Sequence, residues 1–256
     1  MKLPCLLLLL TYYVVLSAQN PAADSVFIRT QFSKREVMIP MRDGVRLFVS
    51  IYTPKDQRKT YPILLKRTPY SCAPYGEKAF VTSFQNMYLA RAGYIWVFED
   101  VRGKYLSEGD FVDVRPFNPQ KSDKDTDEAS DTYDTIDWLI KNAAANNGHV
   151  GVYGISYPGF YATLAALSGH PALKAVSPQA PVTDWFLGDD FHHNGAFMLM
   201  DAFSFYSGFG KPRPKPTTEN AEGFEDWQTP DNYDFYLRAG ALPHYAERFG
   251  MAGIPF

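Results

Sequence analysis

Residues 148–159 read Gly-His-Val-Gly-Val-Tyr-Gly-Ile-Ser-Tyr-Pro-Gly. The first part of this stretch predicts a glycine-rich strand that ends at Ser156, and residues 160–167 predict the helix that follows. Ser156 would then lie at a sharp turn from a strand to a helix. Glycines on both sides let the chain take a strained turn and let the helix approach the strand closely, which are the roles expected for Gly154 and Gly159.

A serine at such a turn has the position that a nucleophile needs. Serine is a weak nucleophile until a base removes its proton, so an enzyme must hold it exposed at a fixed point where a histidine can reach it. The usual form of the turn is Gly-x-Ser-x-Gly, whereas here Pro158 takes the fifth place and glycine follows one residue later. On the pattern alone, Ser156 could equally be a serine in an ordinary strand-to-helix turn.

The segments around this turn predict an α/β fold. Residues 62–66 and 94–98 are apolar runs typical of buried central strands, and residues 78–92 between them predict a helix. Residues 173–177 predict a further strand after the helix that follows Ser156. Because strands and helices alternate in this order, the central sheet should be mostly parallel.

The sheet is expected to begin with antiparallel strands. Residues 37–40 and 45–51 flank the pair Asp43-Gly44, which is a hairpin signal. Later in the chain, the acidic segment 123–128 leads into residues 133–140, whose apolar side chains fall on one face of a helix. Aspartates at positions 123, 125 and 127 alternate like the first ligands of a calcium loop, but Glu128 stands where that loop requires glycine, so a helix N-terminus is the favoured interpretation.

Five ordered blocks of sequence carry a resemblance to a known family. They run from about residue 36 to residue 197 and resemble the X-Pro dipeptidyl-peptidase and cocaine-esterase-like family of serine hydrolases, with the amino-acid ester hydrolases and glutaryl acylases as the nearest relatives in motifs. In that family the turn has the form Gly-x-Ser-Tyr-x-Gly, so Pro158 is no longer a defect. The blocks are Met41-Arg42-Asp43-Gly44-Val45-Arg46-Leu47; Arg67-Thr68-Pro69-Tyr70; Asp100-Val101-Arg102-Gly103 with Ser107-Glu108-Gly109; Tyr133-Asp134-Thr135-Ile136-Asp137-Trp138-Leu139; and Gly154-Ile155-Ser156-Tyr157-Pro158-Gly159.

The resemblance implies an α/β-hydrolase fold and a set of roles at the turn. Ser156 would be the acylated nucleophile, the backbone N–H of Tyr157 one oxyanion donor and the hydroxyl of Tyr70 the other. Tyr70 follows a predicted central strand, where hydrolases commonly place the second oxyanion donor. As one of 17 tyrosines, Tyr70 without its block would be read as a packing residue. Asp100 and Arg102 are interpreted as a pair that organises loops, not as part of the chemistry.

Residues 188–197 resemble the segment of amino-acid ester hydrolases that binds the α-ammonium group of the substrate. Asp190 matches the binding carboxylate by its distance from Ser156. The alternative is that Asp189 and Asp190 cap a helix or lie in a solvated turn. The neighbouring His192-His193 pair could suggest zinc, but adjacent histidines point in different directions and no His-Glu-x-x-His spacing exists, so no metal site and no organic cofactor is predicted.

The first 19 residues have the layout of a secretory signal peptide. Lys2 precedes an apolar run from Leu6 to Leu16, which is too short to span a bilayer, and small residues follow near Ala18. We expect a secreted or periplasmic protein with no membrane segment after cleavage. Only Cys72 would remain, so no internal disulfide is possible.

Charge and composition limit the kinds of partner that the protein can be expected to bind. The formal net charge is −3, which argues against binding to nucleic acid or to an anionic membrane surface. The expected partner is a small ester, amide or peptide substrate, and the sequence does not indicate an oligomeric state. Composition shifts at the prolines after residue 211, so we expect an α/β-hydrolase core over residues 30–205 and the start of a helical cap or insertion over residues 206–256.

The rest of a catalytic triad is not identifiable. In this fold the acid and then the histidine follow the nucleophile along the chain, but His170, His192, His193 and His244 do not follow late strands. We therefore expect an incomplete hydrolase core and an N-terminal fragment of a longer enzyme. The predicted function is ester or amide cleavage through an acyl-enzyme, of the amino-acid ester hydrolase or acylase type, with X-Pro dipeptidyl-peptidase activity and a non-catalytic or inactive fragment as alternatives.

Overall fold

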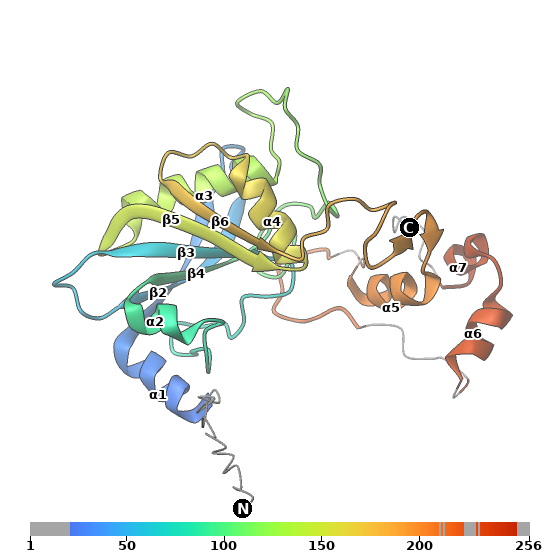
Figure 1. Cartoon of the computed structure of the whole chain (residues 1–256), viewed down its shortest axis with the longest axis horizontal. Coiled ribbons are helices and arrows are strands. Elements are labelled where there is room, and N and C mark those ends of the chain that lie inside the picture. The colour runs from blue at the N-terminus through green and yellow to red at the C-terminus, as the bar shows by residue number, and fades with distance from the viewer. Residues whose placement is uncertain (1–20, 210, 212, 223–228, 230, 250–256) are drawn as a thin grey trace, which may run out of the picture.

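The computed structural model describes residues 21–209, 211, 213–222, 229 and 231–249. A six-stranded sheet with the order β1-β2-β4-β3-β5-β6 forms its centre (Figure 1). The expected signal peptide lies outside the described residues. Among the described residues, no helix combines the length and the apolar character that crossing a membrane requires. The strands are β1 (Phe32–Pro40), β2 (Arg46–Pro54), β3 (Tyr61–Thr68), β4 (Ile95–Asp100), β5 (Asn146–Ile155) and β6 (Leu173–Gln179).

The first two strands form the predicted antiparallel hairpin. Val37 pairs with Val49 in the middle of the ladder, and the turn is closed by a hydrogen bond of 2.8 Å from the N–H of Met41 to the carbonyl of Val45. Gly44 has φ +87°, a left-handed conformation that glycine takes without strain. β2 then pairs antiparallel with β4, so the hairpin closes one side of the sheet.

The other four strands are parallel, as predicted. β3 pairs with β4 on one side and β5 on the other, and β5 pairs with β6. Because the carboxyl ends of parallel strands meet at the same edge of a sheet, the segments that follow these strands converge there. Tyr70 follows β3, Asp100 ends β4, Ser156 follows β5 and Gln179 ends β6.

Two layers of helices cover the faces of the sheet. The helices α3 (Glu128–Asn142) and α4 (Tyr157–Ala166) lie on one face, whereas α1 (Pro21–Gln31) and α2 (Met87–Ala92) lie on the other (Figure 1). Ile136 of α3 and Ala162 of α4 are fully buried against the apolar residues of β3, β4 and β5. Burial of this apolar surface is the main force that holds the first layer together.

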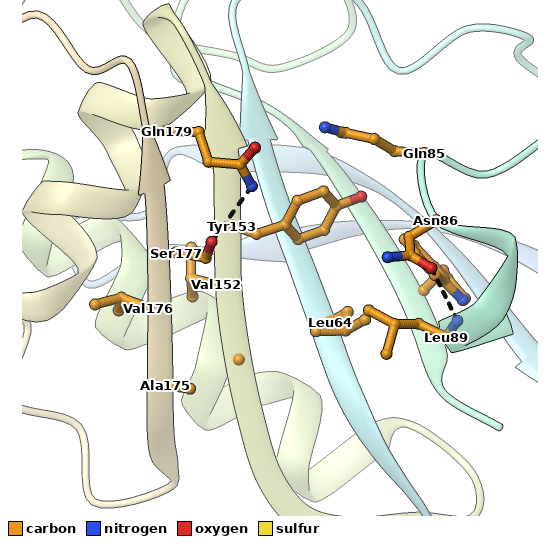
Figure 2. Close-up of a pocket in the computed structure, with 12 residues that line it drawn as sticks. Leu64, Gln85, Asn86, Leu89, Val152, Tyr153, Ala175, Val176, Ser177 and Gln179 are labelled. Carbon is orange, nitrogen blue, oxygen red and sulfur yellow. Dashed lines mark hydrogen bonds between the residues drawn. The ribbon is translucent and has the colours of Figure 1, made fainter. Parts of the chain in front are cut away.

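The second face carries an open hollow beside α2. Figure 2 shows side chains from β5 and β6, among them Tyr153 and Ser177, facing Asn86 and Leu89 at the start of α2. The hollow has a volume of about 350 Å³. On the same face, Trp96 of β4 stacks on Phe84 with ring centroids 4.7 Å apart, which forms the aromatic part of the core.

The predicted helix over residues 78–92 was wrong for its first half. Only residues 87–92 are helical, and Asn86 caps them by accepting a hydrogen bond of 3.1 Å from the N–H of Leu89. The start of the segment is held in another conformation, because the buried ammonium of Lys34 binds the carbonyl of Ala79 together with those of Pro74 and Gly76 just before it. Carbonyls that point at one cation cannot also serve a helical ladder.

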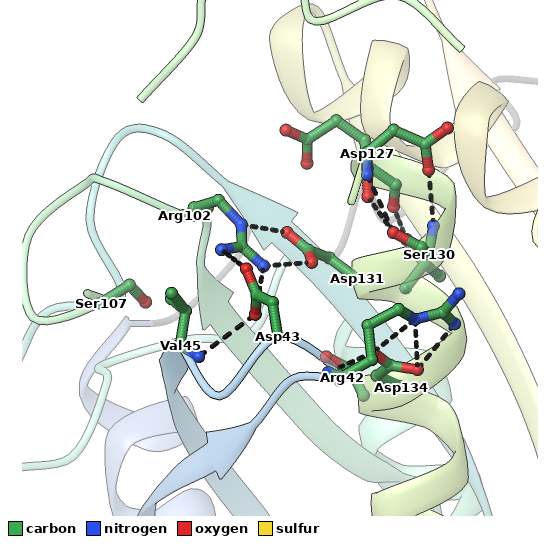
Figure 3. A network of polar contacts seen from close by, with 12 residues as sticks. Arg42, Asp43, Val45, Arg102, Ser107, Asp127, Ser130, Asp131 and Asp134 are labelled. Atoms are coloured by element: carbon green, nitrogen blue, oxygen red, sulfur yellow. Dashed lines mark hydrogen bonds and ion pairs between the residues drawn. The ribbon is translucent and has the colours of Figure 1, made fainter. Parts of the chain in front are cut away.

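Ion pairs at the N-terminal end of α3 tie the hairpin turn to the rest of the fold. Arg102 lies between Asp43 and Asp131, with hydrogen bonds of 2.7 Å to each (Figure 3). The expected pairing of Arg102 with Asp100 was therefore wrong. Asp100 binds a different loop, because its carboxylate accepts the N–H of Cys72.

The acidic segment before α3 has a structural role. Asp127 is the N-cap of α3 and forms a capping box with Ser130 (Figure 3), while Asp125 accepts hydrogen bonds from Ser122. Such a cap satisfies N–H groups that the first helical turn leaves free. Asp125 and Asp127 are thus engaged with backbone and hydroxyl groups, as expected for a helix N-terminus.

A separate group of helices lies beyond the carboxyl edge of the sheet (Figure 1). Phe203, Phe235 and Tyr245 form its small aromatic core. The expected boundary between core and cap, at residues 205 and 206, falls inside α5, and the division into a core domain and a cap stays a prediction. The elements of this region are β7 (His192–His193), β8 (Ala196–Phe197), α5 (Leu199–Phe209), α6 (Asn232–Ala239) and α7 (Leu242–Phe249).

Candidate active site

Ser156 lies at a strained turn between β5 and α4. Its backbone has φ +62° and ψ −126°, a conformation that costs a residue other than glycine about 1–3 kcal/mol. The turn is held from both sides, because the N–H of Ser156 donates to the carbonyl of Gln179 at 2.9 Å and its carbonyl accepts from the N–H of Phe160 at 3.1 Å. The strain is thus maintained by β6 and by the first turn of α4.

The two glycines of the motif are required by space. A Cβ on Gly154 would lie 2.1 Å from the carbonyl oxygen of Pro158, and a Cβ on Gly159 would lie 2.5 Å from that of Gln179. Neither contact can be relieved without moving backbone. Pro158 itself fits because it lies in the first turn of α4, where a helix needs no N–H donor. The position of Gly159, one residue later than usual, therefore still permits close packing of helix and strand.

Tyr70 extends over the turn from the end of β3. Its ring meets that of Tyr157 edge to face, with centroids 6.2 Å apart, and also contacts Phe209. Partial burial, with the negative charges of Asp190 and Asp113, raises the pKa of Tyr70 to about 12. The hydroxyl therefore stays protonated at neutral pH, and it makes no hydrogen bond with any residue that the structure describes. It is available as a donor.

The loop that carries Tyr70 is anchored by Asp100. One carboxylate oxygen accepts the N–H of Cys72 at 2.8 Å, and the other accepts the hydroxyl of Tyr75 at 2.9 Å. Burial raises the pKa of Asp100 to about 6. Asp100 is fully buried, so these hydrogen bonds replace the water that it loses on folding. The end of β4 thereby sets the path of the loop after β3.

The backbone N–H of Tyr157 lies beside Ser156, whereas its side chain binds a different part of the fold. Its N–H is among the first of α4, which have no partner within the helix and so can stabilise negative charge beside Ser156. Its buried hydroxyl donates to Asp113 at 2.7 Å, and the second oxygen of Asp113 accepts the hydroxyl of Tyr206 on α5. Asp113 thus joins the nucleophile turn to α5, a link that no sequence pattern indicated.

The turn opens into a cavity of about 630 Å³. Three carboxylates share its wall, and none of them forms an ion pair with a lysine or arginine among the described residues. Asp189 is the most buried, with a side chain 3% exposed. Its Oδ1 accepts the N–H groups of Phe191 and His192, while its Oδ2 is buried without a hydrogen bond in the described part of the chain. The residues that line the cavity include Tyr70, Ser156, Tyr157, Asp189, Asp190, Asp201, Ser204 and Phe205.

The structure brings the four predicted site residues together, since Tyr70, Ser156, Tyr157 and Asp190 all line this cavity. It adds Asp189 and Asp201 to Asp190. Asp189 lies in the segment that the sequence singled out, whereas Asp201 had no signal beyond its place near the start of α5. The three acids make the cavity negative, which favours a cationic substrate group.

The described histidines lie in other surroundings. His170 is buried against Tyr133, with its Nε2 3.9 Å from Asp137, and His192 lies with its Nδ1 3.8 Å from Asp189. Among the residues that the structure describes, none of the histidines forms a hydrogen bond with Ser156. Within the same residues, no three histidine, cysteine, aspartate or glutamate side chains gather as metal ligands would.

Known proteins share this arrangement of sequence and fold. A family model described as X-Pro dipeptidyl-peptidase (S15 family) matches residues 43–248. Cocaine esterase from Rhodococcus sp. (strain MB1 Bresler) is 37% identical over 164 residues, which cover 64% of this chain and 26% of the esterase. These matches confirm the resemblance that the five sequence blocks indicated.

Two solved structures are similar over most of the chain. An α-amino acid ester hydrolase superposes with a TM-score of 0.76 and 37% identity, covering 96% of this chain and 39% of the hydrolase. An aminopeptidase from a marine sediment Thaumarchaeota archaeon has a TM-score of 0.74 and 37% identity, covering 88% and 37%. Together with the sheet described above, they confirm the predicted α/β-hydrolase fold. The chain spans about a quarter to two fifths of the length of these relatives.

Proposed function

Because this chain belongs to the X-Pro dipeptidyl-peptidase (S15) family, we propose that it carries the nucleophile and the oxyanion donors of a serine hydrolase that cleaves ester or amide bonds. The observation that carries this proposal is the strained turn at Ser156, which lines the same cavity as Tyr70, whose hydroxyl makes no hydrogen bond with the described residues. An ordinary structural serine does not need this strain.

The geometry supports a two-step acyl transfer. The Oγ of Ser156 attacks the carbonyl carbon and gives its proton to a base, and the carbonyl oxygen becomes an oxyanion. This oxyanion accepts hydrogen bonds from the N–H of Tyr157 and the hydroxyl of Tyr70, donors that are worth most where charge develops in the transition state. The bond to the leaving group breaks, the leaving atom takes up a proton, and water then releases the acyl group from Ser156.

The acidic cavity supports an acyl group with a free α-amino function. Asp190 lines the cavity without an ion pair in the described structure, and Asp189 directs a buried, unpartnered oxygen from the same wall. Asp190 itself is exposed at the cavity wall, so its carboxylate is accessible to a substrate, and the negative charge of buried Asp189 beside it adds to the attraction for an ammonium. We therefore favour an amino-acid ester hydrolase or acylase type of activity, with Asp190 as the ammonium ligand.

X-Pro dipeptidyl-peptidase activity is the second candidate, since the family model is named for it. It also uses a substrate with a free amino terminus, but it requires proline before the scissile bond. Paired alanyl and alanyl-prolyl anilides distinguish the two candidates, because a proline-specific enzyme cleaves only the second.

The leader-like residues 1–19 support secretion or a periplasmic location.

A fluorophosphonate probe tests the central proposal. The protein expressed from its complete gene should be labelled, and Ser156→Ala should abolish labelling. Ser177→Ala is the matched control, because Ser177 is an exposed serine of β6 whose Oγ meets only Gln179. Labelling that persists in Ser156→Ala, or no labelling of the wild-type protein, would overturn the assignment of the nucleophile.

A further inference from the structure

A second cavity also borders Tyr70. It has a volume of about 490 Å³ and shares Tyr70, Ser204 and Phe205 with the cavity that holds Ser156. The two spaces are therefore neighbours, and Tyr70, the expected oxyanion donor, borders both. A substrate whose carbonyl oxygen points at Tyr70 can extend into both.

The second cavity has the opposite charge character. Lys104, Lys211 and Arg213 line it, together with a single carboxylate, Glu219. Within the described part of the chain, none of these three cations has a carboxylate within ion-pair distance. Among the described residues that line the first cavity there are three carboxylates and no cation, so the two cavities that share Tyr70 differ in the sign of their charge.

The acceptors of Lys104 and Arg213 are neutral. Lys104 donates to the carbonyl of Phe209 at 2.7 Å, and its ammonium lies 3.8 Å from the centroid of the Phe209 ring. Arg213 donates to the carbonyls of Tyr105 and Ser107, while its buried Nε–H has no acceptor among the described residues. An ammonium has three N–H donors and a guanidinium five, so both groups keep donors for a ligand.

The energetics favour an anion in this space. Burial lowers the pKa of Lys104 to about 8; the charge of Asp113 opposes this shift and that of Arg213 adds to it. Burial lowers the pKa of Arg213 as well. Neither part-buried cation has a carboxylate within ion-pair distance among the described residues, although Asp113 acts on Lys104, and Asp100 and Asp110 act on Arg213, from farther away. An anion that entered between them would form charge-assisted hydrogen bonds with both.

We propose that this second cavity is the subsite for a leaving group that carries a carboxylate. The inference rests on the proposed function, because it places the carbonyl carbon at Ser156 and its oxygen under Tyr70. The acyl part, with its ammonium, then lies among Asp189, Asp190 and Asp201, and the leaving part lies beside Lys104 and Arg213. The substrate class is a short peptide or amino-acyl conjugate with a free amino group on one side of the scissile bond and a carboxylate close to it on the other.

Two substrates that differ only in the leaving group test the subsite. Alanyl-4-aminobenzoate carries the carboxylate, and alanyl-4-aminobenzamide is its neutral match. With the protein expressed from its complete gene, kcat/KM should be at least about tenfold higher for the benzoate, as expected for hydrogen bonds to a charged group. Lys104→Met should bring this ratio close to one, whereas Lys104→Arg should keep it.

Lys59→Met is the matched control. Lys59 is exposed in the loop before β3, at the end of the sheet away from the site, and it should leave both rates and their ratio unchanged. A ratio near one in the wild-type protein would overturn the subsite. The same holds for a high ratio that survives Lys104→Met.

A binding measurement separates this inference from the proposed function. In the Ser156→Ala background, titration calorimetry should detect 4-aminobenzoate at least about tenfold more tightly than 4-aminobenzamide, and Lys104→Met should remove the difference. If the fluorophosphonate probe labels Ser156 but neither the rates nor the binding favour the carboxylate, the subsite is wrong and the hydrolase stands. If labelling fails while Lys104-dependent binding is seen, the anion site stands without the hydrolase.

Discussion

The hydroxyl of Tyr157 and the carboxylate of Asp113 are joined by a hydrogen bond of 2.7 Å, although 44 positions separate them in the chain. Through its second oxygen, the same carboxylate accepts the hydroxyl of Tyr206 on α5. Asp113 therefore holds both Tyr157, the residue after the nucleophile, and α5, the helix that lines the cavity. The nucleophile turn and α5 should respond together when Asp113 is changed.

Asp113→Asn should weaken this junction. An amide has one acceptor oxygen where the carboxylate has two, so one of the two tyrosine hydroxyls loses its partner, at a cost of about 1–3 kcal/mol in the free energy of unfolding. Urea denaturation measures this change. Tyr206→Phe, which removes only the link to α5, should cost about 1 kcal/mol. An unchanged free energy of unfolding in Asp113→Asn would show that this junction does not stabilise the fold.

Tyr70→Phe should lower kcat/KM by about 100-fold, because one of two oxyanion donors is lost while the ring is kept. Steady-state kinetics on an amino-acid ester provide the measurement. Circular dichroism confirms that the variant is folded. Tyr88→Phe is the control, since Tyr88 is 82% exposed on α2. A Tyr70→Phe enzyme within twofold of the wild type would remove Tyr70 from the oxyanion site.

Asp190→Asn should reduce selectivity for substrates with a free α-amino group. The ratio of kcat/KM for an alanyl ester to that for the matching propionyl ester should fall about tenfold or more, because a charge-assisted hydrogen bond is lost. Asp123→Asn, in the exposed segment before α3, should leave the ratio unchanged. Equal losses on both esters would show that Asp190 acts on something other than the ammonium.

Gly159→Ala should destabilise the fold and disturb the nucleophile at once. The new Cβ would meet the carbonyl of Gln179, which also holds the N–H of Ser156, and overpacking against backbone costs about 3 kcal/mol. The urea midpoint and the rate of fluorophosphonate labelling should both fall. Gly188→Ala, where a Cβ meets nothing within 4 Å, is the control. Wild-type labelling in Gly159→Ala would contradict the requirement for close packing.

The preference for a carboxylate leaving group should depend on pH. The pKa of Lys104 lies near 8, lowered by burial and by Arg213 and raised in part by Asp113, so the ammonium is charged below pH 8 and loses its charge above it. The ratio of kcat/KM for the benzoate and benzamide substrates should therefore be highest below pH 7 and decline through pH 8. In Lys104→Arg the ratio should stay constant to pH 10, because a guanidinium does not titrate there. A pH-independent ratio in the wild-type protein would exclude Lys104 as the titrating group.

The sequence was most informative where structure depends on near neighbours. The strands around Ser156 follow from apolar runs of the right length, and Gly154 and Gly159 mark a turn that admits no side chain at either position. Both signals are local, because they arise within about ten residues. The parallel order of β3, β4, β5 and β6 then follows from the helices between them.

Contacts that depend on tertiary packing could not be predicted in the same way. Residues 78–86 have helix-like composition, yet the ammonium of Lys34, on β1, binds the carbonyl of Ala79 and so holds the start of this segment out of helical geometry. Arg102 pairs with Asp43 and Asp131 although Asp100 is closer along the chain. Asp113 lies in an irregular loop and Asp201 lies in α5, so the spacing of residues in the sequence could not predict that they would lie near the site.

The hydrogen bond from Ser156 to Gln179 has a consequence for heat inactivation. Gln179 is the last residue of β6, which pairs with β5, so a local loosening at this strand end would release the hydrogen bond while the interior strands stay folded. When the carbonyl of Gln179 leaves, the strained backbone of Ser156 can relax. Loss of activity on heating would then begin at one strand end, before the molecule as a whole unfolds.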